Sequence, residues 1–228
     1  MSDLMVRSGQ LLYRRISSGE DRGREDFQLT RNRNGSRTLR SLARTDDSRF
    51  VRDVTYTVDG DGRPQEAFVR LQVSERWIGS GYFRTHGDVL HLTAESAGRG
   101  STETSVTVPP RFHIMTHAVM LDGWTFWAFD PEEEGEQSLL IYNTSTRWDG
   151  TDGPVGGLQY LAAKKLGKEQ VQVPAGTFQT TRYRLHSEDI GSPPCDLWVE
   201  DEDLLLVQYR WDEFDLEYVL GSLELSMC

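Results

Sequence analysis

Histidines have the clearest chemical potential in this sequence, because imidazole exchanges a proton near neutral pH. Two of them, His113 and His117, are four residues apart, and on a helix that spacing would place both rings on one face, as in zinc sites. The glutamate that follows the first histidine in zinc proteases is missing, and no third ligand is evident. We therefore expect no metal and no other cofactor. A metal-dependent enzyme that uses these two histidines is the weakest alternative.

An aromatic segment, residues 121–130, follows these histidines. Its letters are LDGWTFWAFD, so that four large rings lie close together in the sequence. If the segment is a strand, its side chains point alternately to opposite faces, and rings cover both of them. Such a strand is expected to lie deep inside the protein.

Candidate catalytic residues flank this segment. A histidine would act as acid or base, while tyrosine or tryptophan donors would stabilise a developing oxyanion. The candidates, in order of preference, are His113, His117, Asp130 and Tyr142. Glycine-rich nucleotide loops, a G-x-S-x-G elbow and a C-x-x-C pair do not occur in the sequence. The reactions that remain need no cofactor and include lyase, isomerase, hydratase and cyclase steps.

Further aromatic residues and one arginine complete the candidate site. A pocket lined by indole and phenol groups would suit a flat apolar or phenolic molecule, although the same rings could simply pack two sheets together. The candidate ligand-binding residues are Trp77, Tyr82, Trp124, Trp127, Trp198, Tyr209 and Arg52. Arg52 shares the period-two phase of Phe50 and Val54, so it either reaches an interior carboxylate or extends to the rim.

The elements that would position these residues are strands. Short runs of alternating apolar and polar residues, separated by Gly, Asp, Asn and Pro, recur through most of the chain. The clearest are 214–220 and a hairpin of 50–58 with 67–73 around the turn DGDGRP. About a dozen strands joined by short turns indicate an antiparallel meander. We predict one all-β domain over residues 1–228, a closed or partly open barrel or a two-sheet sandwich, with at most one or two short helices.

Two segments are compatible with a short helix. Residues 111–121 carry apolar side chains at helical spacing, and residues 159–166 read QYLAAKKL. Either segment could instead be a strand. The acidic run 130–136 and the Gly-rich run 149–157 are the clearest loops.

The composition is that of a globular protein. Hydrophobic residues make up 37% of the chain, and no segment approaches a membrane-spanning length. The net charge of −11 would repel nucleic acid and anionic lipid headgroups, so neither is an expected partner. The N-terminus lacks an apolar stretch of leader length, and we therefore expect a cytoplasmic protein. The cysteines Cys195 and Cys228 are expected to be reduced thiols. Nothing in the sequence specifies an oligomeric state.

Residues 167–210 carry a recognisable pattern. A strand ends in V-x-V-P-A-G-x-F, and a short L-W-V strand and a strongly apolar strand follow. The residues concerned are Val171, Val173, Pro174, Ala175, Gly176, Phe178, Leu197, Trp198, Val199 and 204–207. This pattern resembles the bacterial domain-of-unknown-function 3108 family. The resemblance implies an antiparallel, partly open β-barrel related to lipid-carrier barrels, commonly exported, and it implies no activity. Physically, Pro174 and Gly176 predict a turn, because proline fixes φ and glycine accepts positive φ.

These observations favour a cytoplasmic barrel-like protein that binds a small apolar or aromatic molecule in an aromatic-lined cavity. Cofactor-independent acid–base catalysis on that molecule is compatible with the candidate residues. The alternative is a non-catalytic carrier or interaction module, in which the rings form the core and the histidines are incidental.

Overall fold

The computed structural model describes residues 4–187 and 192–227 of the chain. Within these ranges the chain forms one sheet of fifteen strands and two short 3-10 helices. The first strands are β1 (Met5–Arg15), β2 (Asp21–Arg31), β3 (Arg37–Thr45), β4 (Phe50–Val58), β5 (Pro64–Val73), β6 (Arg76–His86), β7 (Val89–Ser96) and β8 (Gly100–Thr107). The remaining elements are β9 (His113–Met115), η1 (Val119–Trp127), β10 (Glu136–Asn143), β11 (Gly157–Val173), β12 (Gly176–Ser187), β13 (Ser192–Val199), β14 (Leu206–Trp211), η2 (Asp212–Phe214) and β15 (Leu216–Met227).

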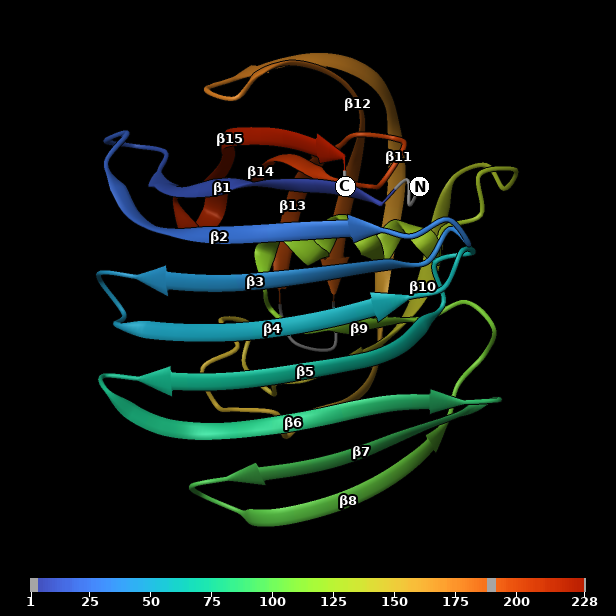
Figure 1. The fold of residues 1–228 in the computed structure, drawn as a ribbon. Coiled ribbons are helices and arrows are strands. Elements are labelled where there is room, and N and C mark those ends of the chain that lie inside the picture. The colour runs from blue at the N-terminus through green and yellow to red at the C-terminus, as the bar shows by residue number, and fades with distance from the viewer. Residues whose placement is uncertain (1–3, 188–191, 228) are drawn as a thin grey trace.

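The sheet is a meander that curls around its own interior (Figure 1). Strands that follow one another in the sequence are antiparallel neighbours from β1 to β8 and from β10 to β15, and β1 pairs with β15. The strand order begins at β8 and ends at β9, so the sheet is not closed into a continuous barrel within the described ranges. The predicted all-β, partly open barrel-like fold is confirmed.

The period-two alternation builds the inner face of the sheet. Along β3 and β4 nearly every second residue is buried, because successive side chains of a strand point to opposite faces. The predicted hairpin is present as β4 and β5 in antiparallel register. Its turn is held by the Asp59 carboxylate, which accepts the backbone N–H groups of Asp61 and Arg63 at 3.0 and 2.9 Å. The predicted turn at 174–176 joins β11 to β12.

The segment LDGWTFWAFD differs from the prediction, because most of it belongs to the 3-10 helix η1 and none of it is a strand. η1 lies inside the curl, between the front and back strands in Figure 1. The rings of Trp124 and Phe126 are buried there and that of Trp127 is partly buried, so a strand was not required to bury this segment. Gly123 permits the close approach of η1 to the chain before β14, because a β-carbon there would lie 2.3 Å from the carbonyl oxygen of Leu204.

Of the two segments that could hold a helix, only the end of the first is helical. Residues 111–121 contain β9 and only the start of η1, and β9 pairs in parallel with β10. For residues 159–166 the strand alternative is observed, because these residues lie in β11 between β10 and β12. Hydrogen bonding to two neighbouring strands outweighs the local helical pattern.

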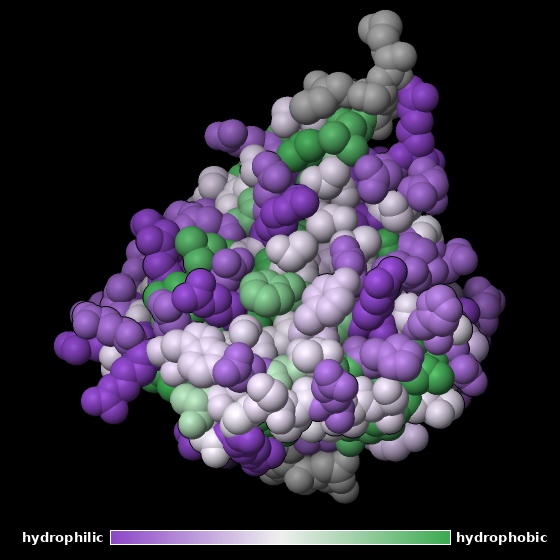
Figure 2. All heavy atoms as spheres, turned by 60° about the horizontal axis from the view of Figure 1, so that its bottom comes forward, coloured by the Kyte–Doolittle hydropathy of each residue, from purple (hydrophilic) through white to green (hydrophobic). Residues whose placement is uncertain are grey.

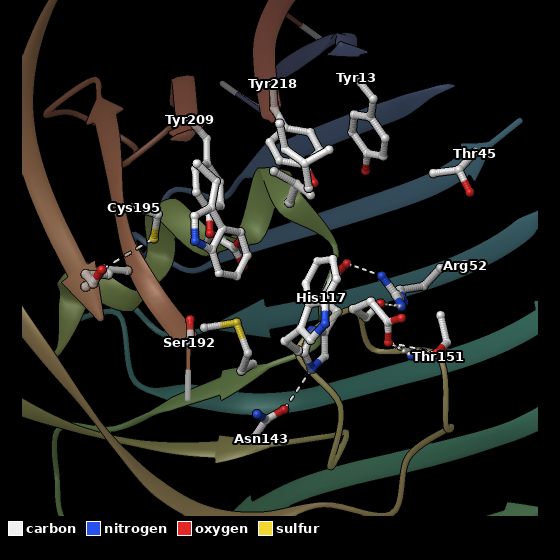
Figure 3. Close-up of a pocket in the computed structure, with 18 of the residues that line it drawn as sticks. Tyr13, Thr45, Arg52, His117, Asn143, Thr151, Ser192, Cys195, Tyr209 and Tyr218 are labelled. Carbon is white, nitrogen blue, oxygen red and sulfur yellow. Dashed lines mark hydrogen bonds between the residues drawn. The ribbon is translucent and has the colours of Figure 1, made fainter. Parts of the chain in front are cut away.

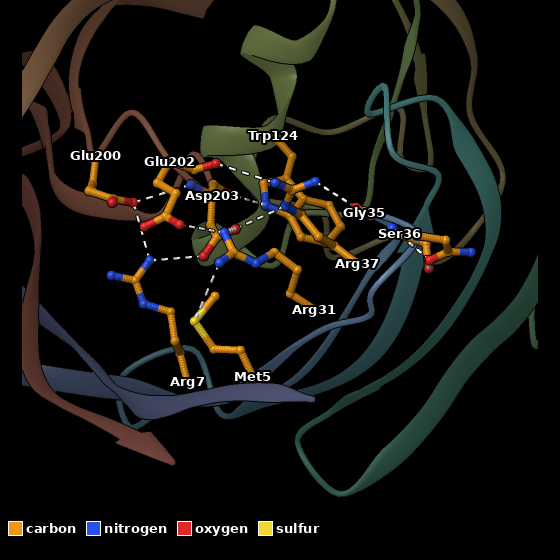
Figure 4. Close-up of polar contacts among 11 residues, drawn as sticks. Met5, Arg7, Arg31, Gly35, Ser36, Arg37, Trp124, Glu200, Glu202 and Asp203 are labelled. Carbon is orange, nitrogen blue, oxygen red and sulfur yellow. Dashed lines mark hydrogen bonds and ion pairs between the residues drawn. The ribbon is translucent and has the colours of Figure 1, made fainter. Parts of the chain in front are cut away.

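A buried cluster of charges fixes η1 in the interior (Figure 4). The fully buried Asp203 carboxylate pairs with the guanidinium groups of Arg7, Arg31 and Arg37 at 3.0, 3.3 and 2.9 Å. The backbone carbonyl of Asp203 accepts the indole N–H of Trp124, on η1, at 3.0 Å. Strands β1, β2 and β3 are thereby joined to η1 through one carboxylate and one backbone carbonyl.

Candidate functional site

A cavity of about 310 Å³ lies between η1 and the inner face of the curled sheet (Figure 3). Its apolar lining comes from strands that are distant in the sequence, including Phe50 on β4, Ile141 on β10 and Leu161 on β11. A smaller number of polar groups face the same space. The cavity is therefore a mainly apolar pocket, as ligand pockets usually are.

One wall of the cavity is a row of aromatic rings. Tyr13, Tyr218 and Tyr209 lie directly opposite one another in the register of β1, β15 and β14. Their ring centroids are 4.7 Å apart for Tyr13 and Tyr218, and 5.3 Å apart for Tyr209 and Tyr218. Trp211 extends the row beside Tyr209 at 5.9 Å, and Trp148, from the loop between β10 and β11, contacts Trp211 edge-on at 5.6 Å. The strand register thus assembles a continuous aromatic surface.

Arg52 supports the cavity from β4. Its guanidinium group donates to the backbone carbonyl of His117, and also to those of Asp149 and Gly150 at 3.2 and 2.9 Å. Burial lowers the pKa of Arg52, and nearby acids oppose this effect. Of the two expected positions, the interior is observed, but the partners are carbonyl oxygens of the backbone. Arg52 therefore ties the 149–150 loop to the chain that enters η1.

His117 lines the cavity, and its contacts define which ring nitrogen carries the proton. Asn143 Oδ1 accepts the N–H of Ser145 at 3.1 Å and lies 2.7 Å from His117 Nε2, while the Asn143 amide donates to Gln159 at 2.9 Å. Since Oδ1 can only accept, Nε2 carries the proton and Nδ1 is the basic nitrogen. Burial first, and then the Arg52 charge, lowers the pKa of His117 to about 4. The imidazole is neutral at neutral pH.

Two carboxyl groups lie beside the same wall. Glu25, on β2, is fully buried and accepts the hydroxyls of Tyr13 and Ser41 at 2.7 and 2.6 Å, together with the N–H of Met120 at 3.3 Å. Asp122, on η1, lines the cavity, and its Oδ1 atom is buried with no hydrogen-bond partner among the described residues. Burial raises the pKa of Glu25, although its three donors oppose this. Burial and then the Glu25 charge raise the pKa of Asp122 well above its usual value.

His113 is separated from this site. Its side chain is buried in the core and does not line the cavity. The distance between His113 Nδ1 and the hydroxyl oxygen of Tyr56 is 3.4 Å. Burial lowers the pKa of His113 to about 3. His113 and His117 therefore do not face a common point, and within 4–187 and 192–227 no group of three or more His, Cys, Asp or Glu side chains converges as metal ligands would.

The predicted site residues separate into those that share the cavity and those that do not. Arg52, His117 and Tyr209 line it together. Tyr142 points from β10 to the other side, where its ring packs on Phe83 at 5.6 Å. Asp130 is near the surface and forms an ion pair with Arg111 at 3.2 Å.

The remaining predicted residues, all aromatic, lie elsewhere in the fold. Trp124 is a core residue bound to Asp203, and Trp127 lines a second, wider recess beyond the other end of η1, under the Arg37 guanidinium at 5.0 Å. Trp198 donates its indole N–H to Glu169 at 2.7 Å. The exposed Tyr82 donates its hydroxyl to Glu66 at 2.9 Å, and the half-buried Trp77 on β6 lines neither recess.

Sequence reasoning missed Asp122, Glu25 and the tyrosines 13 and 218. A signal for Glu25 exists, since it shares the period-two phase of Phe27 and Leu29 and is thus a charge at an inward position. No comparable signal marks Asp122, because its position depends on the path of η1 through the interior.

Comparison with known proteins adds information about the fold. No protein-family model matches this chain, and no curated protein does. A β-barrel-like protein of the domain of unknown function DUF1849 from Brucella abortus is similar in structure, with a TM-score of 0.56 and 10% identity over 99% of this chain and 98% of that chain. A DUF1089 family protein from Pseudomonas aeruginosa gives a TM-score of 0.49 and 12% identity over 82% of this chain and 89% of that chain.

The fold and the comparison define the class of protein. The chain is an all-β, open barrel-like protein whose interior holds an aromatic cluster. At this level of identity the similarity shows the fold alone. The resemblance of residues 167–210 to the 3108 family stays a prediction. Within the described part of the chain, no helix has the length and apolar character needed to cross a membrane.

Proposed function

We propose that this protein binds a small apolar or aromatic molecule in the cavity beside η1. The observation that carries the proposal is a pocket of about 310 Å³ with a wall of aromatic rings and a mainly apolar lining. Small-molecule pockets have volumes of roughly 300–1,000 Å³ and are lined in this way. Figure 2 shows one outer face on which hydrophobic residues form only small separate patches, so the surface seen there offers no comparable apolar site.

Acid–base catalysis on the bound molecule is the second candidate function. The neutral His117 and the Asp122 carboxyl both line the cavity, with pKa values moved in opposite directions by burial. Burial thus favours the protonated form of Asp122 and the unprotonated form of His117, which is the arrangement that general acid–base catalysis needs. His117→Asn would then abolish turnover while leaving binding intact.

The proposal is tested by filling the cavity. Leu161 is buried on β11 and lines the cavity, whereas its neighbour Tyr160 is 57% exposed on the opposite face of the strand. We expect Leu161→Trp to weaken the binding of N-phenyl-1-naphthylamine, a neutral apolar dye, by at least about tenfold, and Tyr160→Trp to leave it unchanged. Dye fluorescence measures the affinity, and circular dichroism shows that both variants are folded. Equal affinities in both variants, or no saturable binding to the wild type, would exclude this function.

A further inference from the structure

We propose that Asp122 donates a hydrogen bond to the bound molecule, and that this molecule carries an accepting oxygen, as in a ketone or an ester. This inference rests on the proposed function, and it names the polar end of a ligand that is otherwise apolar or aromatic. Its starting point is the unpartnered carboxyl oxygen of a side chain that lines the cavity.

The contrast with Glu25 shows what Asp122 lacks. Both oxygens of Glu25 receive donors, from a tyrosine hydroxyl, a serine hydroxyl and the N–H of Met120. Three donors stabilise an ionised carboxylate. Asp122, two residues after Met120 on the same 3-10 helix, has a buried oxygen that receives no donor in the part of the chain that the structure describes. Other buried side-chain atoms of the described residues also lack a partner, but among the residues that carry them only Asp122 lines the cavity, where a bound molecule could supply one.

The charges around Asp122 favour its neutral form. The nearby charge of Glu25, on β2, opposes ionisation of Asp122, and the guanidinium group of Arg52, whose charge acts in the other direction, donates to backbone carbonyls. An ionised Asp122 would be a second buried anion without a counter-ion in contact, which is costly in an apolar environment. The neutral carboxyl keeps one O–H group, and an O–H group needs an acceptor.

The same charges argue against a cationic ligand. Arg22 and Arg52 both line the cavity, so an ammonium group bound beside Asp122 would share the space with two guanidinium groups. Arg22 is held there by an ion pair with Asp47 at 2.9 Å, and Arg52 by its three carbonyl partners. A neutral molecule with an accepting oxygen satisfies the carboxyl without adding a charge.

The experiment uses three naphthalene probes of nearly equal shape. 2-Acetylnaphthalene offers a carbonyl oxygen, 2-isopropenylnaphthalene replaces that oxygen by a CH₂ group, and 1-(2-naphthyl)ethylamine carries an ammonium group. Each is titrated into the wild type, Asp122→Asn and Asp122→Ala by calorimetry. Asp122→Asn keeps a donor of similar size, and Asp122→Ala removes it. Asp122→Leu, which is apolar and nearly isosteric, replaces the alanine variant if that variant does not fold.

We expect the wild type to bind the ketone about tenfold more tightly than the alkene, because the alkene leaves the carboxyl unpaired. Asp122→Asn should keep most of this preference, and Asp122→Ala should lose it. The carbonyl stretching frequency of the bound ketone should be lower in the wild type than in Asp122→Ala, a readout that a merely structural role would not change.

The other outcomes are distinct. If the wild type binds the ketone and the alkene equally well, the cavity binds ligands but Asp122 is not a donor, and the inference is wrong while the proposed function stands. If the ammonium probe binds most tightly and Asp122→Asn loses it, the site recognises a cation instead. If no probe binds to the wild type, the proposed function fails, and this inference fails with it.

Discussion

Two aspartates are associated with the 3-10 helix η1 inside the curled sheet, and their environments differ. Asp122 belongs to η1, while Asp203 contacts it. Asp203 is fully buried, its carboxylate meets three arginines, and its carbonyl accepts the indole of Trp124 (Figure 4). Asp122 lines a cavity, and one of its oxygens has no partner among the described residues. The Asp203 carboxylate is paired with opposite charge on three sides, while Asp122 faces a cavity that has a wall of aromatic rings.

The difference separates a structural carboxyl group from a candidate functional one. Charge pairs around Asp203 compensate its desolvation and lock strands β1, β2 and β3 onto η1. No such compensation is built for Asp122, so keeping an acid there costs stability that an amide or an apolar residue would not cost. Sites where local stability rules are broken are the expected locations of function. The comparison can be tested by making the same substitution at both positions.

The largest effect is expected at Asp203. Asp203→Asn keeps the shape of the side chain but removes the charge that pairs with Arg7, Arg31 and Arg37. Arg37 would then lose its carboxylate partner, and Arg7 and Arg31 would keep only Glu200 and Glu202. We therefore expect the free energy of unfolding to fall by about 3–5 kcal/mol. Urea denaturation measures this change. Glu202→Ala, which removes a largely exposed partner of Arg31, is the control and should cost less than about 1 kcal/mol.

If Asp203→Asn were no more destabilising than Glu202→Ala, the arginine cluster would not be what holds η1. Asp203 could then no longer be regarded as the structural member of the pair of aspartates.

The pH dependence of stability at His117 tests the environment of the cavity. Its pKa is lowered from 6.5 to about 4, so between these values the unfolded chain binds more protons than the folded one. Stability linked to His117 is therefore present above pH 6.5 and is lost as the pH falls towards 4. We expect the wild type to lose up to about 3 kcal/mol more than His117→Asn over this range. Asparagine suits the position because the φ of His117 is +59°.

Urea denaturation at several pH values measures this difference. His86→Asn, at an exposed position on β6, is the matched control and should follow the wild type. An unchanged pH dependence in His117→Asn would mean that the imidazole is not held neutral by the cavity.

The fold was largely predictable because alternation in a strand is a local property. The expected strand 50–58 has the same bounds as β4, and the expected strand 67–73 lies within β5. The η1 segment was not predictable, since four rings in a short run can be buried by a strand or by a 3-10 helix surrounded by a sheet. For 159–166 the sequence left helix and strand open, because pairing with β10 and β12 decides the conformation there.

The site was predictable only where the phase of a strand was clear. Arg52 and Tyr209 share the phase of buried neighbours, and both face the cavity. Tyr82 is adjacent to Phe83, so an aromatic residue is present in both phases, and the structure buries Phe83 and exposes Tyr82. Asp122 could not be identified from its neighbours in sequence, because its surroundings come from β2, β4 and the aromatic wall.

The smallest effect, and the one of opposite sign, is expected at Asp122. Its pKa is raised above the usual value of 3.8, so the folded protein holds a proton that the unfolded chain releases as the pH rises. Relative to Asp122→Asn, the wild type therefore loses stability from about pH 4 upwards until the pKa of the folded state is passed. At pH 7 we expect Asp122→Asn to be more stable than the wild type, on the order of 1 kcal/mol.

Paired urea titrations at pH 4 and pH 7 measure this difference, and Asp130→Asn, a change at a more exposed aspartate, should alter stability by less than about 0.5 kcal/mol. Destabilisation by Asp122→Asn comparable to that by Asp203→Asn would show that both carboxyls are structural. If Asp122→Asn instead increases stability while Asp203→Asn strongly decreases it, the aspartate at position 203 stabilises the fold. The aspartate at position 122 is then retained although it destabilises the fold. That pattern is expected of a side chain retained for what it binds.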